Sequence, residues 1–549
     1  VKSFDDSDCK QIKGYIKAVV PQFGELDPSL GWMMVLAETF PAAMRAAKAI
    51  NVEYNISETS TYSTESLLEH GKELVEDGND GGVLYHEGNF DESYKNAHHT
   101  YQAQYTTDFV AHALMEPYTS VVGEINGAWH IISGQQHNSL TSWTIPSFIA
   151  SQTGKKPEEI KLVIHQRIAG GGYGTRMDTA TKFAAAASAD LKRPVKVIFT
   201  REAMMKDTEP RTASYQKLSS GLTKEGKIDS LNISISSGSF ENRKDWGLPE
   251  AFFVPDVEGK GKFLATQSYD GSSHWYSIAN RKCSIFLNEK LMSSVPVNPL
   301  RSVGNGYIVF TVESFIDEIA HQEGKDPVAF RLSMLDGSDD KIVSPSRTPD
   351  IMAMVLARET PHALESEVKA KRLRNVLQVA AGKAGFGLKE KIKNQGMGVA
   401  VAAAESRHNP TWLACVAEVN VNPDSGIVDV TKLTYAVDCG TVINPQNVEA
   451  QIEGAALTGM SIALYESLTF EKGGFTQENF NHYKWLRMRN APKVEVDIIK
   501  SEDHPVGIGE PALAAVGPAI ANAIFDAVGV RVRRLPIRPQ DIKSGIDSS

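Results

Sequence analysis

The chain is poor in the residues that hold metal clusters. Its 549 residues include four cysteines, Cys9, Cys283, Cys415 and Cys439, and no two of them form a C-x-x-C pair. Clustered cysteines at short spacing are what iron–sulfur clusters and structural zinc sites require. The sequence therefore predicts no such centre held by this chain alone.

Common nucleotide and hydrolase motifs are also missing. No G-x-x-x-x-G-K-[ST] sequence occurs, and the glycine-rich stretch "AGGGYGTR" is not G-x-G-x-x-G, because Thr175 stands where the last glycine should be. The segment "GMSIA", which begins at Gly459, lacks the final glycine of a G-x-S-x-G elbow. NAD binding, ATP binding and serine hydrolase chemistry are therefore not expected.

Long apolar runs and a basic surface are absent as well. Stretches such as "MGVAVAAA" are too short to cross a bilayer, and the first residues, "VKSFDDSDCKQIKG", do not resemble a signal peptide. The formal net charge of −10 argues against nucleic acid as a partner. The 42% share of hydrophobic residues is that of a globular protein, and the length suits two to four domains.

One stretch concentrates chemical interest. "HPVGIGEPALAAVGPAIANAIFDAVG" places Glu510 between glycine and proline, ahead of an apolar helix that should end at Gly529. Pro511 should bias Glu510 towards an extended conformation. Glu510 is the only charge between Val506 and Val516, and apolar company should raise its pKa, as suits a general base. The alternative interpretation is a solvated loop glutamate.

The glycine loop "AGGGYGTR" is the second candidate. It follows a predicted strand in "KLVIHQRI" and precedes a predicted helix in "DTATKFAAAASADL". Such a helix entrance presents backbone N–H groups that bind anions. A phosphate-bearing cofactor and a plain tight turn both fit this pattern.

Elsewhere the elements can be predicted coarsely. Residues 1–55 alternate strand and helix signals, 56–100 are polar and indicate a loop or linker, and 336–394 are charged and largely helical. "TWLACVAEVNVNPDSGIVDVTKLTYAVDCG" predicts a β-hairpin, and "NVEAQIEGAALTGMSIALYESL" a long helix.

Together these motifs resemble a known family. "GGGYGTR" is similar to the GGGFGRR loop of molybdenum hydroxylase large subunits, and the segment around Glu510 looks like their catalytic C-terminal segment. "SYQKLSSGL", "PLRSVGNGYIVFTVESFIDEIAHQEGKDPVAFRLSML", "DCGTVINPQNVEAQIEGAALTGMSIAL" and "ENFNHYKWLRMRNAPKVEVDIIKS" follow in family order between them. The closest branch is the isoquinoline 1-oxidoreductase type with the flavin-independent aldehyde dehydrogenases; xanthine dehydrogenases are more distant relatives.

The resemblance implies an α+β fold with three parts. Residues 1–55 would be the C-terminal part of an α/β-hammerhead domain, 56–335 a first molybdopterin-binding domain, and 336–549 a second one with a helical connection at 336–394. The strands that usually open the hammerhead would lie before Val1 or on another polypeptide.

The resemblance also implies the chemistry. Family members oxidise an aldehyde, or hydroxylate a carbon beside a ring nitrogen, with water as oxygen source. The cofactor would be molybdopterin, in bacteria often as the cytosine dinucleotide, with molybdenum held through the pterin dithiolene and no Fe–S, FAD or NAD in this chain. Electrons would pass to a small [2Fe–2S] subunit, with a cytochrome c as a further acceptor. The family is found in periplasm and cytoplasm, with the periplasm slightly favoured.

Site residues follow from the matched motifs. Glu510 would be the catalytic base, and Met177 stands where xanthine dehydrogenases have a purine-binding glutamate, which argues against a purine substrate. Gln136 beside Gln135 leaves a second register open for the first glutamine. The expected cofactor-binding residues are Gln135, Gly171, Gly172, Tyr173, Gly174, Arg301 and Gln451.

Two other functions remain open at this point. One is a catalytically inactive molybdopterin-binding scaffold, which the presence of Glu510 disfavours. The other is a reductase of the same family acting on aromatic thioesters, which no sequence feature favours.

Overall fold

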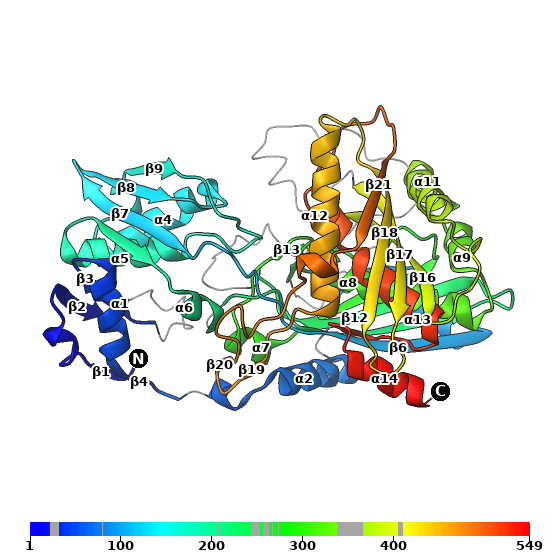
Figure 1. Ribbon diagram of the computed structural model, residues 1–549, viewed down its shortest axis with the longest axis horizontal. Helices are drawn as coiled ribbons and strands as arrows, with labels where there is room; N and C mark the ends of the chain where they lie inside the picture. The colour runs from blue at the N-terminus through cyan, green and yellow to red at the C-terminus, as the bar shows by residue number, and fades with distance from the viewer. Residues whose placement is uncertain are drawn as a thin grey trace.

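The fold is that of a computed structural model of the chain. Figure 1 shows an elongated molecule with a smaller lobe that carries the N-terminus and a larger lobe that carries the C-terminus. The structure describes residues 1–21, 32–56, 58–79, 81–206, 208–240, 242, 253–255, 258, 263–265, 267–272, 274–336, 366–404 and 410–548.

The smaller lobe begins with two short β-ladders and one helix. Strand β1 pairs with β4, and β2 pairs with β3, both antiparallel. Thr39 accepts a hydrogen bond from the Ala42 amide and so starts the helix. Their bounds are β1 Ser3–Asp5, β2 Tyr15–Val19, β3 Met34–Ala37, α1 Phe40–Ala49 and β4 Asn51–Glu53.

A four-stranded sheet completes this lobe, in the order β10-β7-β8-β9. The alanine-rich helix α5 packs on it, and its Phe183 shares a core with Leu36 of β3, so the N-terminal segment and this sheet form one lobe. The bounds are β7 Thr119–Ile125, β8 Ala128–Ser133, α4 Asn138–Thr153, β9 Leu162–Gln166, α5 Thr179–Leu191 and β10 Val195–Ile198.

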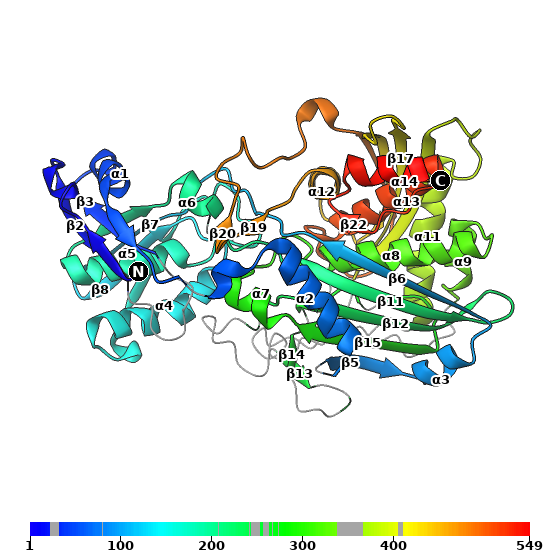
Figure 2. The ribbon, with the colours of Figure 1, turned by 90° about the horizontal axis from the view of Figure 1, so that it is seen from below.

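The larger lobe contains a six-stranded sheet, in the order β22-β6-β11-β12-β15-β5. Neighbouring residues of β11 face opposite sides: Tyr215 packs with Val75 of α2, and Gln216 bonds to Thr311 of α8. Helices therefore cover both faces (Figure 2). The bounds are α2 Thr64–Asp77, β5 Gly82–Glu87, α3 Phe90–Lys95, β6 His99–Thr107, β11 Ser214–Leu222, β12 Ile228–Ser237, β15 Asn280–Leu287, α8 Asn305–Gln322 and β22 Arg534–Leu535.

The segment 56–100 is not a loop, so that prediction was wrong. Ser63 and Ser66 cap α2 reciprocally, and Gly78 ends it in the left-handed conformation. Leu67 and Val75 bury one face of the helix. The polar composition belongs to the outer surface of elements whose inner face is apolar.

A third sheet, in the order β16-β17-β18-β21, lies above the six-stranded one in Figure 1. The predicted hairpin is confirmed by β17 and β18, which pair antiparallel, and the predicted long helix by α12. The bounds are α11 Ser366–Ala384, β16 Gln395–Ala404, β17 Thr411–Val421, β18 Val428–Asp438, α12 Pro445–Leu464, β21 Lys493–Ile498 and α13 Val516–Val528. Shorter elements are α6 Arg201–Lys206, β13 Phe253–Pro255, β14 Phe263–Ala265, α7 Glu289–Ser294, α9 Pro327–Ser333, β19 Phe470–Glu471, β20 Gly474–Phe475 and α14 Pro539–Ser548.

Helix α13 is a core helix that supports the Glu510 loop. It lies against β16 so closely that a Cβ on Gly398 would overlap the backbone of Ala519 and Ala523. The run Pro511–Val528 is long and apolar enough to cross a membrane, which the sequence reading missed, yet 78% of it is buried inside the protein. The small residues on both sides thus fix the helix, and with it the loop before it.

Candidate functional site

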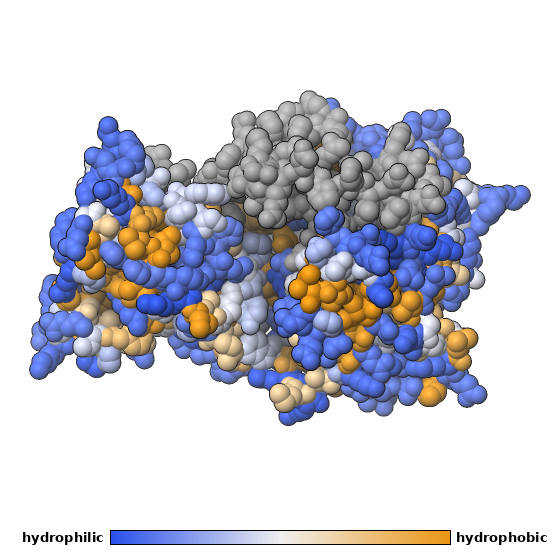
Figure 3. All heavy atoms as spheres, turned by 90° about the horizontal axis from the view of Figure 1, so that it is seen from above, coloured by the Kyte–Doolittle hydropathy of each residue, from blue (hydrophilic) through white to orange (hydrophobic). Residues whose placement is uncertain are grey.

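Three loops meet where the two lobes face each other. The glycine loop 170–174 follows β9, the loop 299–302 precedes α8, and the loop 507–510 leads into the short 3₁₀ helix η8 (Pro511–Leu513). The surface between the lobes is hollowed in the space-filling view (Figure 3). The predicted strand, glycine loop and helix are confirmed by β9 and α5.

Arg301 joins two of the predicted site segments. Its Nε donates to the Gly509 carbonyl at 2.5 Å, and its Nη2 donates to both the backbone and side-chain oxygens of Gln451 at 3.0 Å. The guanidinium thus holds the residue before Glu510 and the exposed amide of α12 in one arrangement. Arg301, Gln451 and Glu510 are predicted site residues that the structure brings together.

Glu510 is held by Ser302, which follows Arg301 on the loop 299–302. The Ser302 hydroxyl donates to the Glu510 carbonyl at 2.6 Å, and the Ser302 amide donates to the carboxylate Oε2 at 3.3 Å. The carboxylate is half-buried. These two hydrogen bonds orient both the peptide and the side chain of the candidate base.

The expectation that Glu510 is extended was wrong. Its φ is −119° and its ψ is −38°, which lies in the helical region despite the following proline. The reason is that Glu510 starts η8: its carbonyl accepts from the Leu513 amide at 3.3 Å as well as from Ser302. These contacts outweigh the steric bias that Pro511 exerts.

Backbone strain collects on the loop beside Glu510. Ser302 has φ 76° and Val303 has φ 44°, and a β-branched residue rarely adopts such a conformation. Strain of this kind persists where surrounding contacts over-determine the backbone, and it is common at functional sites.

The glycine loop approaches this strained loop through its backbone. Gly171 and Gly174 have φ values of 87° and 111°, and Tyr173 has φ 52° with an exposed ring. A Cβ on Gly174 would overlap the Pro299 carbonyl oxygen, whereas a Cβ on Gly172 would overlap the side-chain oxygen of Gln136. Glycine is therefore required at Gly174 both by conformation and by space.

The two adjacent glutamines lie in different surroundings. Gln135 is 4% exposed and its amide bonds to Thr141 and Thr181, inside the smaller lobe. Gln136 is exposed, and its Oε1 accepts from the Gly174 amide at 3.1 Å. The structure therefore places Gln136, the alternative register, beside the glycine loop, and places Gln135 away from it.

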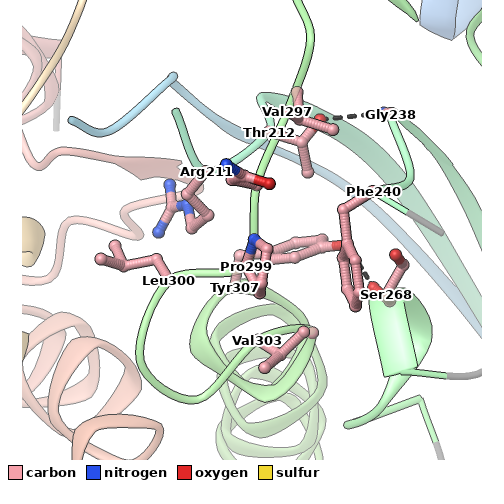
Figure 4. Close-up of a pocket in the computed structure, with 12 residues that line it drawn as sticks. Arg211, Thr212, Gly238, Phe240, Ser268, Val297, Pro299, Leu300, Val303 and Tyr307 are labelled. Carbon is pink, nitrogen blue, oxygen red and sulfur yellow. Dashed lines mark hydrogen bonds between the residues drawn. The ribbon is translucent and has the colours of Figure 1, made fainter. Parts of the chain in front are cut away.

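A pocket adjoins the strained loop, with about 250 Å³ of empty volume that is partly open to solvent. Leu300 and Val303 line it, and Figure 4 shows Arg211 beside Leu300 at one end and Phe240 with Ser268 at the other. Arg211 is 3% exposed, and its Nε and Nη1 have no partner among the described residues. Burial lowers its pKa to about 10.

The residues present fit a flat polar cofactor. The glycine loop offers backbone without side chains, and the Gln136 amide lies on it. The Arg301 guanidinium and the Gln451 amide lie together beside the loop that carries Glu510. Within the described ranges, no group of three His, Cys, Asp or Glu residues is arranged to hold a metal ion.

Some residues in or beside this site were not predicted from the sequence. Ser302 was overlooked although it adjoins Arg301, because a lone serine in a loop gives no signal. His112 and Glu116, which contact the same loops, were also missed. Their only mark is the polar pair in the otherwise apolar segment "FVAHALMEPY".

Comparison with known proteins identifies the family of the chain. Two family models, both described as molybdopterin cofactor-binding domains, match residues 75–242 and 354–492, which together are more than half of the chain. A membrane-bound aldehyde dehydrogenase of Gluconacetobacter polyoxogenes, named for pyrroloquinoline quinone, is 33% identical over all of this chain and 67% of its own length. Isoquinoline 1-oxidoreductase subunit beta of Brevundimonas diminuta is 28% identical over 79% of this chain and 49% of its own length.

Solved structures share the fold. Aldehyde oxidoreductase of Desulfovibrio gigas superposes with a TM-score of 0.72 at 15% identity, covering 100% of this chain and 75% of that one. Quinoline 2-oxidoreductase of Pseudomonas putida 86 gives 0.69 at 14% identity over 100% and 92%. Fold and site thus define a large oxidoreductase subunit with two molybdopterin-binding domains. The chain belongs to the molybdenum hydroxylase family.

Proposed function

We propose that the chain is the catalytic subunit of an enzyme that oxidises an aldehyde, or hydroxylates an N-heterocyclic carbon, with oxygen from water. The observation that carries this proposal is the fixed carboxylate: Ser302 holds Glu510 by peptide and side chain, and Arg301 holds the peptide before it. The names of two relatives, an aldehyde dehydrogenase and an isoquinoline oxidoreductase, support these substrate classes.

The cofactor we propose is molybdopterin as its cytosine dinucleotide, with molybdenum bound through the pterin dithiolene. Gly171, Gly172, Tyr173 and Gly174 would approach it through their backbone, and Arg301 and Gln451 would contact the pterin. Gln136 takes the role first expected of Gln135, because only its amide reaches the glycine loop. When bound, this group supplies a two-electron acceptor and Lewis acidity.

The role of Glu510 is to take a proton from water as the oxygen attacks the substrate carbon. A general base must be oriented before the reaction, and the Ser302 amide fixes Oε2 in one position. The chain around it is tied down as well: Thr411 donates to the Gly507 carbonyl at 2.7 Å, and Tyr435 donates to the Ala512 carbonyl at 3.0 Å. The base is thus preorganised on both sides.

The test is Glu510→Gln, which keeps size and hydrogen bonding but cannot accept a proton at working pH. We expect turnover per bound molybdenum to fall by ~10²–10⁴-fold, the range for lost acid–base catalysis. Metal content and melting temperature should stay at the wild-type level, since Glu510 is not proposed as a ligand. Glu502→Gln, an exposed glutamate of the same segment, is the matched control. Full turnover in Glu510→Gln would refute the assigned role.

Metal and nucleotide analysis of the purified protein separates enzyme from scaffold. Molybdenum with a released cytosine nucleotide supports the proposed cofactor. Pyrroloquinoline quinone in its place, as in the name of the Gluconacetobacter relative, would refute it. Molybdenum without turnover on any aldehyde or N-heterocycle would favour the inactive scaffold.

A redox partner follows from electron balance. Hydroxylation releases two electrons, and the four cysteines of this chain are all buried and unpaired. We therefore propose a small [2Fe–2S] subunit as acceptor, with a cytochrome c beyond it. Co-purification from native cells should recover an iron–sulfur chain. An isolated chain that reduces a physiological acceptor efficiently would contradict this partner.

A further inference from the structure

His112 lies in the segment between β6 and β7 and contacts the site loop 299–302 from outside, without a role in the function proposed above. It is 5% exposed, and its Nε2 lies 2.9 Å from the Pro299 carbonyl oxygen. A carbonyl only accepts, so Nε2 must carry the proton of this hydrogen bond. Nδ1 has no hydrogen bond of good geometry among the described residues, although the Glu209 carbonyl also lies near the ring.

The histidine is neutral in this place. Burial lowers the pKa of His112 to about 4, and the Arg211 guanidinium lowers it further against the effect of the Pro299 and Glu209 carbonyls. A neutral ring with its proton on Nε2 is a single, well-defined donor. The interaction with Pro299 is therefore an uncharged hydrogen bond across the physiological pH range.

The site has two walls: the glycine wall, residues 170–174, and the Glu510 wall, made of the loops 299–302 and 507–512. The Pro299 carbonyl lies where the two walls meet. It is the group that a Cβ on Gly174 would overlap. The peptide it belongs to leads directly into Arg301 and Ser302, which hold the Glu510 loop. The position of this one peptide therefore sets both the approach of the glycine loop and the start of the Glu510 contacts.

The segment that carries His112 also contacts the glycine loop, through Glu116. The Glu116 carboxylate accepts from the Gly170 amide at 2.5 Å and pairs with Arg176 at 3.3 Å. Arg176 in turn donates from Nε to the Gly171 carbonyl at 2.9 Å and from Nη2 to the Glu116 carbonyl. Residues 112–116 thus form a strap, with His112 on one wall and Glu116 on the other.

We propose, on the basis of the cofactor function put forward above, that His112 is a positioning residue that holds the Pro299 peptide against Gly174 by its Nε2–H bond. It contacts neither substrate nor the reacting atoms; it acts through Pro299. Loss of the donor leaves a buried carbonyl unpaired and lets the two walls separate. The expected consequence is weaker retention of the cofactor.

The experiment compares three variants in the full-length protein. His112→Gln can place an N–H near the Nε2 position, whereas His112→Asn is too short and His112→Leu has no donor. We expect molybdenum per chain to fall about ten-fold in His112→Leu and His112→Asn, the scale of one unpaired buried group, and to recover in His112→Gln. His274→Leu is the matched control, because His274 is 6% exposed and buried in the larger lobe.

A second readout needs no cofactor. Amide hydrogen exchange in segments 170–174 and 299–303 of the apo protein should speed up about ten-fold in His112→Asn and stay at the wild-type rate in His112→Gln. Equal molybdenum and equal exchange in the Gln and Asn variants would overturn the positioning role. Wild-type protein without molybdenum would overturn the proposed function instead, and the exchange comparison would still decide the role of His112.

Discussion

The two walls of the site are held by different sets of hydrogen bonds. On the Glu510 wall, side chains donate to backbone carbonyls: Arg301, Ser302, Thr411 and Tyr435 bind four carbonyls between residues 507 and 512. On the glycine wall, backbone amides donate to side chains: Gly170 to Glu116 and Gly174 to Gln136. The Glu510 wall is thus held mainly through its carbonyls, whereas the glycine wall is held through two amides and, by Arg176, through the Gly171 carbonyl.

This difference separates two kinds of sensitivity. The Glu510 wall rests on several individual side chains, so it can be weakened one hydrogen bond at a time. The glycine wall depends on the absence of side chains, and at Gly174 one added methyl group meets the Pro299 backbone, which cannot turn aside. We therefore expect abrupt effects on the glycine wall and graded effects on the Glu510 wall.

Gly174→Ala should give the largest effect. Its φ of 111° is unfavourable for alanine, and the new Cβ would overlap the Pro299 carbonyl oxygen. We expect loss of most bound molybdenum with the fold retained, measured as metal per chain and by melting temperature. Gly172→Val should lose less, because the atom it meets, the end of the Gln136 side chain, can turn away.

Gly474→Val is the control for added bulk, since a Cβ at that position meets nothing within 4 Å. It should keep the wild-type metal content. A Gly174→Ala protein with full molybdenum would show that the glycine wall does not depend on close backbone approach.

Ser302→Ala should have an intermediate effect. It removes the hydroxyl that donates to the Glu510 carbonyl at 2.6 Å but keeps the backbone amide that binds Oε2. Losing one buried hydrogen bond destabilises by about 1–2 kcal/mol, so we expect turnover per molybdenum to fall about ten-fold with metal retained. Ser293→Ala, at an exposed serine of α7, should change nothing. A loss of metal in Ser302→Ala would contradict the role of Ser302 in orienting Glu510 and would assign it to cofactor binding instead.

Much of this fold was readable from local signals. The strand, glycine loop and helix at β9–α5, the hairpin β17–β18 and the helix α12 each carry their own periodicity and turn residues. The segment 56–100 was misread because its capping box uses Ser66 at the position where glutamate or glutamine is the usual signal. Its short strand β5 is also fixed by pairing with β15, far along the chain.

The residue types of the site could be predicted from the sequence, but the contacts between them could be predicted less well. Arg301, Gln451 and Glu510 lie together, and Gly174 meets Pro299 on the loop that carries Arg301; the roles of these residues stay predictions. Which of two adjacent glutamines faces the glycine loop depends on tertiary partners, here Thr141 and Thr181, that no local pattern reveals. The bent backbone of Glu510 likewise depends on Ser302, which is 208 residues away.

The smallest expected effect on the site concerns Glu466, which lies behind the strap rather than on either wall. Tyr483 donates to its Oε2 at 2.9 Å and accepts from the Ala111 amide at 3.0 Å, next to His112. Glu466 is 7% exposed, and burial raises its pKa from the ordinary 4.5 to about 7. The folded protein therefore keeps a proton on Glu466 between pH 4.5 and 7 that the unfolded chain releases.

The contribution of Glu466 to the free energy of unfolding is thus fully present below pH 4.5 and is lost as pH rises through about 7. At ~1.4 kcal/mol per pKa unit the change is about 3 kcal/mol. Glu466→Gln removes this titrating group. From pH 4.5 to 7.5 the unfolding free energy of the wild type should therefore fall by about 3 kcal/mol relative to that of the variant. Buried His112 and His274, with pKa values lowered by burial to about 4 and about 3, change stability in the opposite direction but equally in both proteins, so the difference isolates Glu466. Urea unfolding at the two pH values measures it, and a difference independent of pH would mean that Glu466 is ionised in the fold. Turnover per molybdenum should stay within about two-fold, because a neutral Gln still accepts from Tyr483 and leaves the strap in place.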